Sequence, residues 1–276
     1  MFTIRGGTFG GPVDLTINGF LPVSDEQLQA NIDNAAGLGL KELEPGPIVP
    51  LAIVGGGPTI NNHVETLQKW SGHVWAINGA FGWCRDNGID ATFISVDPHP
   101  IVARWAEGAK KAILHKQCPP EAFAILEDVT LFDSNGCSGT TVAAAIVAGA
   151  KTRHESITLF GCESCYLPKS SHAYMDEDLA EQMIVSSGGQ FFLTRPDFYF
   201  QAQKLAELIR GLDGYVKEES GGLLRAFIKS PDHWIAWLSD EICKGLKPIK
   251  ELLNGPPSLR LQDGATRPDC SSSIRQ

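Results

Sequence analysis

The sequence predicts an α/β protein with a Rossmann-like core, in which helices cover both faces of a mainly parallel sheet. Short apolar segments rich in β-branched residues alternate with segments of helical spacing, and short connections join them. The apolar segment LAIV at 51–54 also runs into three glycines and a proline, Gly55 to Pro58, as a strand–turn–helix unit does. A helical extension is expected after this core.

The individual elements follow from local signals. Ser24 is a candidate N-cap for a helix that closes near Gly37, because acids follow it and apolar residues recur at helical spacing. Pro and Gly at 45–47 then break the chain. Strands are expected at 51–55, 73–77, 92–96, 112–115, 124–126 or 129–132, 157–160 and 191–194. Helices are expected at 60–70, 80–87, 139–150, 176–187 and 198–211.

Four regions are expected along the chain. Residues 1–45 form a lead-in or small hairpin and the first helix, and 46–212 form a Rossmann-like nucleotide-binding domain. Residues 213–255 form a helical cap, in which a helix at 231–253 carries Trp234, Trp237, Leu238 and Ile242 on one face, either to cover the core or to contact a partner. The tail at 256–276 is rich in Pro, Gly and Ser and is expected to be disordered.

Composition limits the classes of partner that this protein is expected to bind. The net charge of −9 includes no basic block, which disfavours nucleic acid, and no apolar run is long enough to span a bilayer. Without a signal peptide at the N-terminus, a cytoplasmic protein is expected. Seven cysteines without framework spacing fit reduced thiols, and the lone pair Cys162 and Cys165 favours buried neutral thiols over zinc. A small-molecule nucleotide and its acceptor are the expected partners, and assembly into a homo-oligomer is left open.

The glycine turn is the first candidate site. Its backbone amides, at Gly55, Gly56 and Gly57, and the positive end of the helix that Pro58 opens would hold a phosphate or carboxylate. A glycine-rich turn without a ligand is the alternative. The turn matches neither the GxGxxG fingerprint nor the P-loop.

Polar residues follow three other strands, and the carboxyl ends of parallel strands meet at one edge of a sheet. Asn78 would read a base or ribose, or merely occupy a turn. Asp97 would bind Mg²⁺ or cap the next helix, and His99 would bind phosphate, shuttle a proton or stay solvated. Glu163 would add a second metal ligand or hold a substrate hydroxyl, with a solvated loop acid as the alternative.

A second anion site is expected at Ser138, Gly139, Thr140 and Thr141, where free amides and hydroxyls open a helix of small residues. A plain N-cap explains the serine nearly as well. This site would face the glycine turn across the crevice.

The segments GGGPT, INGA and GIDATFISVDP, with the later SGTTVAAAIVAGAKTRHESITLFGCE, resemble the MptE-like family of 6-hydroxymethylpterin diphosphokinases. Maf-type flagellin glycosyltransferases share the pattern, as do bacterial sialyltransferases more distantly, and relatives are common in phage genomes. The resemblance implies phosphate contacts at Gly55, Gly57, Pro58 and Thr59, a nucleotide contact at Asn78 and the strand-end acid at Asp97. Three departures stand out: Thr59 replaces Ser, Ala91 and Thr92 replace Pro-Asp, and Glu163 replaces Asp.

The resemblance therefore implies a nucleotide-dependent transferase. As a diphosphokinase it would use ATP and Mg²⁺, with Asp97, His99 and Glu163 as catalytic residues and Asp97 and Glu163 as metal ligands. A glycosyltransferase with a CMP-sugar donor is the alternative within this class. A non-catalytic nucleotide-binding module is the alternative outside it.

Overall fold

The computed structural model describes residues 2–8, 11–17, 23–133, 140–166, 173, 183–230 and 233–237. Its main sheet contains eight strands: β3 (Lys41–Glu42), β4 (Leu51–Val54), β5 (His73–Ile77), β6 (Thr92–Ser95), β7 (Ala112–His115), β8 (Val129–Phe132), β9 (Ile157–Phe160) and β12 (Val216–Glu218). Their order is β12-β9-β4-β5-β6-β7-β8-β3, and every neighbouring pair is parallel. The expected parallel sheet is confirmed.

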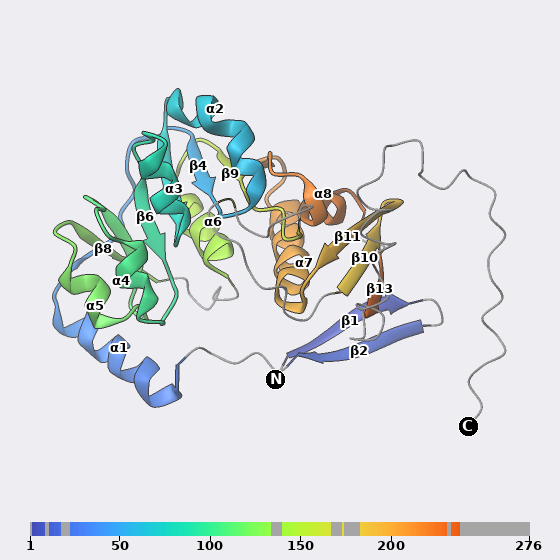
Figure 1. Ribbon diagram of the computed structural model, residues 1–276. Coiled ribbons are helices and arrows are strands. Elements are labelled where there is room, and N and C mark those ends of the chain that lie inside the picture. Colours follow the sequence, from blue (N-terminus) through green and yellow to red (C-terminus); the bar gives the residue numbers. More distant parts are fainter. Residues whose placement is uncertain are drawn as a thin grey trace, which may run out of the picture. The chain divides into compact units, whose positions relative to one another are not determined.

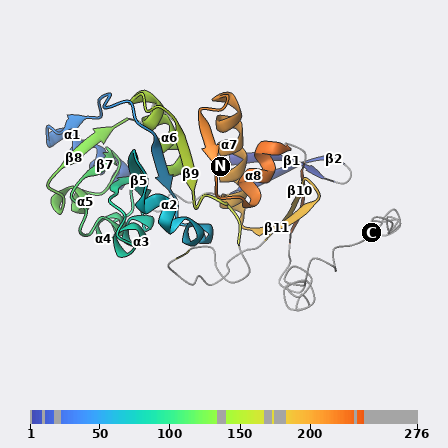
Figure 2. The ribbon, with the colours of Figure 1, turned by 90° about the horizontal axis from the view of Figure 1, so that it is seen from above.

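Helices cover both faces of this sheet (Figures 1 and 2). One face packs against α1 (Asp25–Gly37), the 3₁₀ helix η1 (Pro58–His63), α2 (Val64–Gln68), α3 (Ala80–Asp86), α4 (Ile101–Trp105) and α5 (Pro120–Ala124). The other packs against α6 (Thr141–Lys151), α7 (Pro196–Gly211) and α8 (Gly222–Lys229). Within β4, Leu51 and Ile53 belong to one hydrophobic cluster and Ala52 and Val54 to the other, which explains its unbroken apolar sequence.

Local sequence signals fix several boundaries. The Ser24 hydroxyl accepts a hydrogen bond from the Gln27 amide at 3.2 Å, so it caps α1 as expected. Strands β5, β7 and β9 begin and end at the expected residues. The helix expected at 60–70 begins and ends two residues earlier, as the 3₁₀ helix η1 followed directly by α2, with Pro58 in its first turn.

The chain reverses its direction across the sheet at β4. From β4 it adds β5, β6, β7 and β8 in order on one side, and α6 then carries it back to β9 on the opposite side of β4. Adjacent turns diverge at such a topological switch point, and ligands bind there in open parallel sheets.

A second, antiparallel sheet overturns two helix predictions. It is formed by β10 (Met183–Ser187), β11 (Gln190–Thr194) and β13 (His233–Trp237). The helix expected at 176–187 is thus wrong over 183–187, where burial alternates with the period of a strand and Gly188 and Gly189 form a turn with positive φ. The helix expected at 231–253 is likewise wrong over 233–237, because this segment pairs with β10.

The other described elements agree with the predictions in part. The hairpin expected near the N-terminus is present as β1 (Phe2–Thr8) and β2 (Gly11–Ile17). The strand at 129–132 is β8, whereas Ala124 ends α5. Strands β3 and β12 and helix α8 were not predicted. Leu238, Ile242 and the tail at 256–276 lie outside the described residues, in a separate unit that begins at Leu238. None of the described helices is long and apolar enough to cross a membrane.

Candidate functional site

A pocket of about 180 Å³ lies at the carboxyl ends of β4, β5 and β9, at the switch point of the sheet. Its described lining comes from the turns after these strands and from the starts of α6 and α7. The lining residues are Gly55, Gly56, Gly57, Ile77, Asn78, Thr141, Val142, Gly161, Cys162, Glu163, Ser164, Cys165, Phe198 and Gln201. Most of the predicted strand-end residues are therefore brought together here.

The glycine turn is packed against the turn after β9. The Gly55 amide donates to the Phe160 carbonyl at 2.7 Å, and the Gly57 amide donates to the Gly161 carbonyl at 2.8 Å. A Cβ atom on Gly55 would lie 2.5 Å from the Gly161 oxygen, so glycine is needed for this close approach of two backbones. The prediction that the turn amides hold a phosphate is therefore corrected for Gly55 and Gly57, whose amides already donate to backbone carbonyls. Among the described residues, none accepts a hydrogen bond from Gly56 N–H.

The Glu163 side chain packs against the glycine turn. It is 1% exposed, and its Oε1 accepts a hydrogen bond from the Thr59 amide at 2.5 Å. Its Oε2 is buried and has no hydrogen-bond partner among the described residues. A Cβ atom on Gly57 would lie 1.8 Å from Oε2, so glycine at 57 makes room for the carboxyl group. Glu163 is thus a buried pocket residue, unlike the solvated loop acid that was the alternative.

Burial is the main influence on the acidity of Glu163, and it raises the pKa of this carboxyl group. Hydrogen bonds from Thr59 and from the backbone of Glu163 itself lower the pKa, and the negative charge of Glu218 raises it further. The carboxyl group therefore holds its proton to a higher pH than an exposed glutamate would.

Asn78 lies beside the glycine turn with a strained backbone. Its φ of 49° is in the left-handed region, and its Oδ1 is buried without a hydrogen-bond partner among the described residues. Ser164, a second pocket residue, has a φ of 54°. Non-glycine residues in this region cost energy and cluster at functional sites, so both observations favour a functional pocket.

The first turn of α6 forms another wall of the pocket. Thr140 is its N-cap, because its hydroxyl accepts a hydrogen bond from the Ala143 amide at 3.1 Å. Thr141 and Val142 line the pocket, and no described residue accepts a hydrogen bond from their amides. Of the anion site expected at this helix, Thr141 lines the pocket and Thr140 caps the helix, while Ser138 and Gly139 lie outside the described residues. Val142 is a pocket residue that was not predicted.

Asp97 and His99 do not reach this pocket. Asp97 Oδ1 accepts a hydrogen bond from the His99 amide at 2.9 Å, and His99 Nδ1 accepts one from the Ile101 amide at 3.1 Å. His99 is exposed to solvent. Both side chains therefore order the turn before α4, although Pro100 rather than Asp97 is the N-cap residue of that helix.

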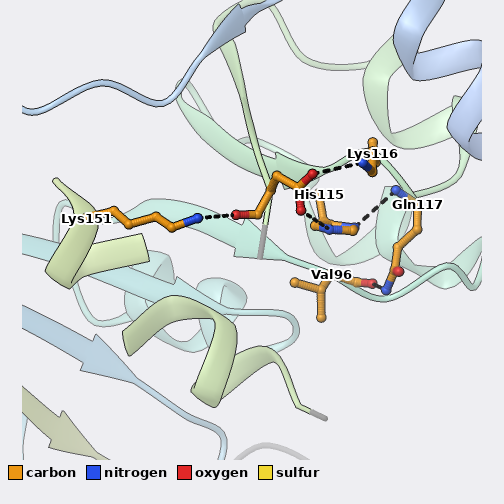
Figure 3. Close-up of polar contacts among 6 residues, drawn as sticks. Val96, His115, Lys116, Gln117 and Lys151 are labelled. Atoms are coloured by element: carbon orange, nitrogen blue, oxygen red, sulfur yellow. Dashed lines mark hydrogen bonds and ion pairs between the residues drawn. The ribbon is translucent and has the colours of Figure 1, made fainter. Parts of the chain in front are cut away.

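The sheet edge around Asp97 is closed by internal hydrogen bonds. The Gln117 side chain donates to the Val96 carbonyl, as Figure 3 shows. Asn31, which is fully buried in α1, donates to the carbonyls of Pro98 and Gln117. Beyond them, Lys116 and Lys151 both bind Asp133, through its carboxylate and its carbonyl. The polar groups of Val96, Gln117 and Asp133 are thus engaged in contacts with other parts of the protein.

The two predicted metal ligands are consequently separated. Glu163 follows β9 and Asp97 follows β6, and three interstrand spacings of about 4.8 Å each lie between these strands. Each acid already accepts a backbone hydrogen bond. No group of three or more His, Cys, Asp or Glu residues in the described part of the chain could hold a metal ion. The residues present do not fit a shared Mg²⁺ site.

Two further pocket residues, Phe198 and Gln201, had no recognisable signal in the sequence. Phe198 and Gln201 belong to α7 and reach the pocket only because this helix packs against α6 and α8, and Gln201 donates to the Ser164 hydroxyl at 3.3 Å. Cys162 and Cys165 are free and buried, and burial raises the pKa of the Cys165 thiol to about 12. The expectation of buried neutral thiols is confirmed for this pair.

No protein-family model matches the chain, and no curated protein matches it. Two solved structures of a mammalian sialyltransferase align with it at 10% sequence identity. One covers 74% of this chain and 87% of its own length with a TM-score of 0.41. The other, a complex with Gal-beta-1-3GalNAc-ortho-nitrophenol, covers 70% and 79% with a TM-score of 0.38. Alignments at these TM-scores identify no ligand, so the evidence for one is the pocket itself.

Proposed function

We propose that this chain is a transferase that binds a nucleotide-activated donor of the CMP-sugar kind in the pocket between β4, β5 and β9. One observation carries the proposal. The N-terminus of α6 and two buried side-chain oxygens, from Asn78 and Glu163, converge on the switch point of a parallel sheet, and neither oxygen has a hydrogen-bond partner among the described residues. A phosphate group and a nucleoside are the ligand parts that such a combination suits.

The phosphate would bind at α6. The amides of Thr141 and Val142 have no acceptor among the described residues, and they belong to an 11-residue helix whose dipole places positive charge at this end. In transfer from a CMP-sugar, an acceptor hydroxyl oxygen bonds to the sugar carbon and releases its proton to solvent. The bond from that carbon to a phosphate oxygen breaks, and the phosphate leaves with additional negative charge. Fixed amides at that position stabilise this charge in the transition state.

The nucleoside would bind at Asn78. This residue follows the second strand of the first βαβ unit, and the side chain at this place in Rossmann folds contacts the ribose. An amide side chain both donates and accepts hydrogen bonds, so it suits a ribose or a base. Ligand pockets usually span about 300 to 1,000 Å³, so a pocket of 180 Å³ would hold the phosphate and part of the nucleoside.

The separation of Asp97 from Glu163 favours this donor over ATP. Diphosphoryl transfer concentrates negative charge on several phosphate groups, which Mg²⁺ and its carboxylate ligands normally neutralise. Only Glu163 of the expected acidic pair lines the pocket. A nucleoside monophosphate leaving group carries less charge, and helix amides are a sufficient partner for it. The preference for cytidine itself comes from the resemblance to CMP-sugar-dependent enzymes.

A thermal-shift screen tests the proposal. CMP, CDP, CTP, ATP and GTP are each added in Mg²⁺ and in EDTA, because a ligand that binds the native state raises its melting temperature. We expect cytidine phosphates to raise the melting temperature equally in both conditions. A shift confined to ATP with Mg²⁺ would support the diphosphokinase instead. If CMP binds but no CMP-sugar is consumed with any acceptor glycan, the chain is a binding module.

A further inference from the structure

Glu163 is a pocket residue whose two carboxyl oxygens have different surroundings. Oε1 accepts the hydrogen bond from the Thr59 amide, so it behaves as the carbonyl oxygen of the group. Oε2 is buried, faces the glycine turn and has no partner among the described residues. An unpartnered polar atom in a side chain that is 1% exposed is costly, and a ligand atom in the pocket would remove that cost.

The groups around Glu163 offer no positive charge. None of the described lining residues is Lys, Arg or His. The thiols of Cys162 and Cys165 lie on the same turn, and Gly222 at the start of α8 packs against the Glu163 Cβ position. Arg225 of α8 is held by Glu218, with its Nε 2.8 Å from Glu218 Oε2. Within the described part of the chain, an ionised Glu163 would therefore be a buried charge without a counter-ion.

We propose that Glu163 serves the pocket as a neutral carboxylic acid, in which Oε1 holds the Thr59 amide and Oε2–H donates a hydrogen bond to a phosphate oxygen of the bound nucleotide. This inference rests on the proposed function, because it takes the ligand to be a nucleotide. It also explains how a glutamate shares a small pocket with an anion, since an ionised carboxylate would repel the phosphate. The direction of the Glu163 pKa shift agrees with this role.

The first test needs no ligand. A carboxyl group with a raised folded-state pKa binds more protons in the folded than in the unfolded state, so stability is full below the ordinary value of 4.5 and is lost as pH rises through the folded pKa. We expect Glu163→Gln to remove this part of the pH dependence of urea unfolding. Glu219→Gln is the matched control, because Glu219 is exposed on the adjacent strand end, and it should unfold with the parent profile.

The second test is calorimetric binding of CMP and of cytidine between pH 5 and 9. Above the pKa of Glu163, the dissociation constant of CMP for the parent should rise about tenfold per pH unit relative to that for Glu163→Gln. Glutamine keeps the acceptor at Oε1 and offers N–H in place of Oε2–H. Because phosphate monoesters themselves titrate near pH 6, the variant profile is the reference. Cytidine lacks the phosphate and should show no such difference.

The outcomes separate the two proposals. If CMP binds to neither protein at any pH, the nucleotide function is overturned, whatever the stability profiles show. If CMP binds but the substitution Glu163→Gln lowers the CMP affinity most at high pH, the ionised carboxylate is the binding form. The neutral-acid role is then overturned. Should the variant fail to fold, the ¹³Cδ chemical shift of Glu163 in the parent decides, because ionisation near pH 4.5 would contradict the proposal.

Discussion

Two regions at the carboxyl ends of the main-sheet strands differ in whether their polar side chains have partners within the described protein. At β4, β5 and β9 the turns diverge around a pocket, and the buried oxygens of Asn78 and Glu163 lack partners among the described residues. At β6 and β7, which we call the closed end, Asp97 and Gln117 instead form hydrogen bonds with nearby backbone groups. Similar side chains follow strands at both places. The difference shows that a strand-end acid is available to a ligand only where the topology leaves room for one.

The largest expected effect is a loss of stability when the packing around the pocket at β4, β5 and β9, the open end, is disturbed. Gly57→Val would place Cβ 1.8 Å from Glu163 Oε2 and 2.8 Å from the Gly161 oxygen, so it should lower the free energy of unfolding by about 3 kcal/mol. Urea denaturation measures the loss. As a control, Gly82→Ala in α3 meets no atom within 4 Å and should stabilise the protein by about 0.5 to 1 kcal/mol. Parental stability of Gly57→Val would show that Glu163 moves aside freely.

The second prediction isolates one amide of α6. Thr141→Pro removes the amide at the first helical position, where proline is well tolerated, and Thr140 before it is already extended at φ −157° and ψ 156°. Loss of a donor to a charged ligand costs about 1.5 to 3 kcal/mol, so CMP should bind at least about tenfold more weakly. Thr141→Ala keeps the amide and serves as the control. Equal CMP affinity of both variants in calorimetry would remove α6 from the phosphate site.

The contributions of the closed and open ends to stability should change in opposite directions with pH. His115 at the closed end is 6% exposed, and burial lowers its pKa, with Lys116 acting in the same direction and Asp133 against it. A depressed histidine pKa gives stability that is present above the ordinary value of 6.5 and is lost as pH falls through the folded pKa. Glu163 gives the reverse trend.

Urea midpoints between pH 8 and pH 5 measure this difference. His115→Gln should flatten the loss of stability toward low pH. Part of that loss will remain, because burial also lowers the pKa of His154. If the profile of His115→Gln has the parent slope, then His115 does not contribute to the acid sensitivity of the closed end.

The smallest effect is expected at Asp97. Asp97→Asn keeps an oxygen that accepts the His99 amide, so the free energy of unfolding should change by less than about 0.5 kcal/mol. CMP affinity should match that of the parent in both Mg²⁺ and EDTA, because Asp97 is absent from the described lining of the pocket. A loss of affinity that appears only in Mg²⁺ would restore the metal-site hypothesis.

Several elements of this protein follow from the sequence alone. Strands β5, β7 and β9 are short continuous apolar runs between turn residues, and α1 begins at a serine that caps it, so local signals suffice. The meeting of Gly55, Asn78 and Glu163 at one edge also follows, because the carboxyl ends of parallel strands lie side by side. These outcomes depend on interactions within a short window or on a general property of parallel sheets.

Only the tertiary structure decided which strand ends share the pocket. The strand order puts β4 between β9 and β5, which joins Glu163 to Asn78 and leaves Asp97 three strands away from Glu163. The order also sets the turn after β9 against the glycine turn, so the amides of Gly55 and Gly57 donate to the carbonyls of Phe160 and Gly161. Segments 183–187 and 233–237 are strands because they pair with each other, nearly fifty residues apart. The physical reason is common to all three: hydrogen-bond partners distant in sequence determine the outcome, and no local pattern specifies them.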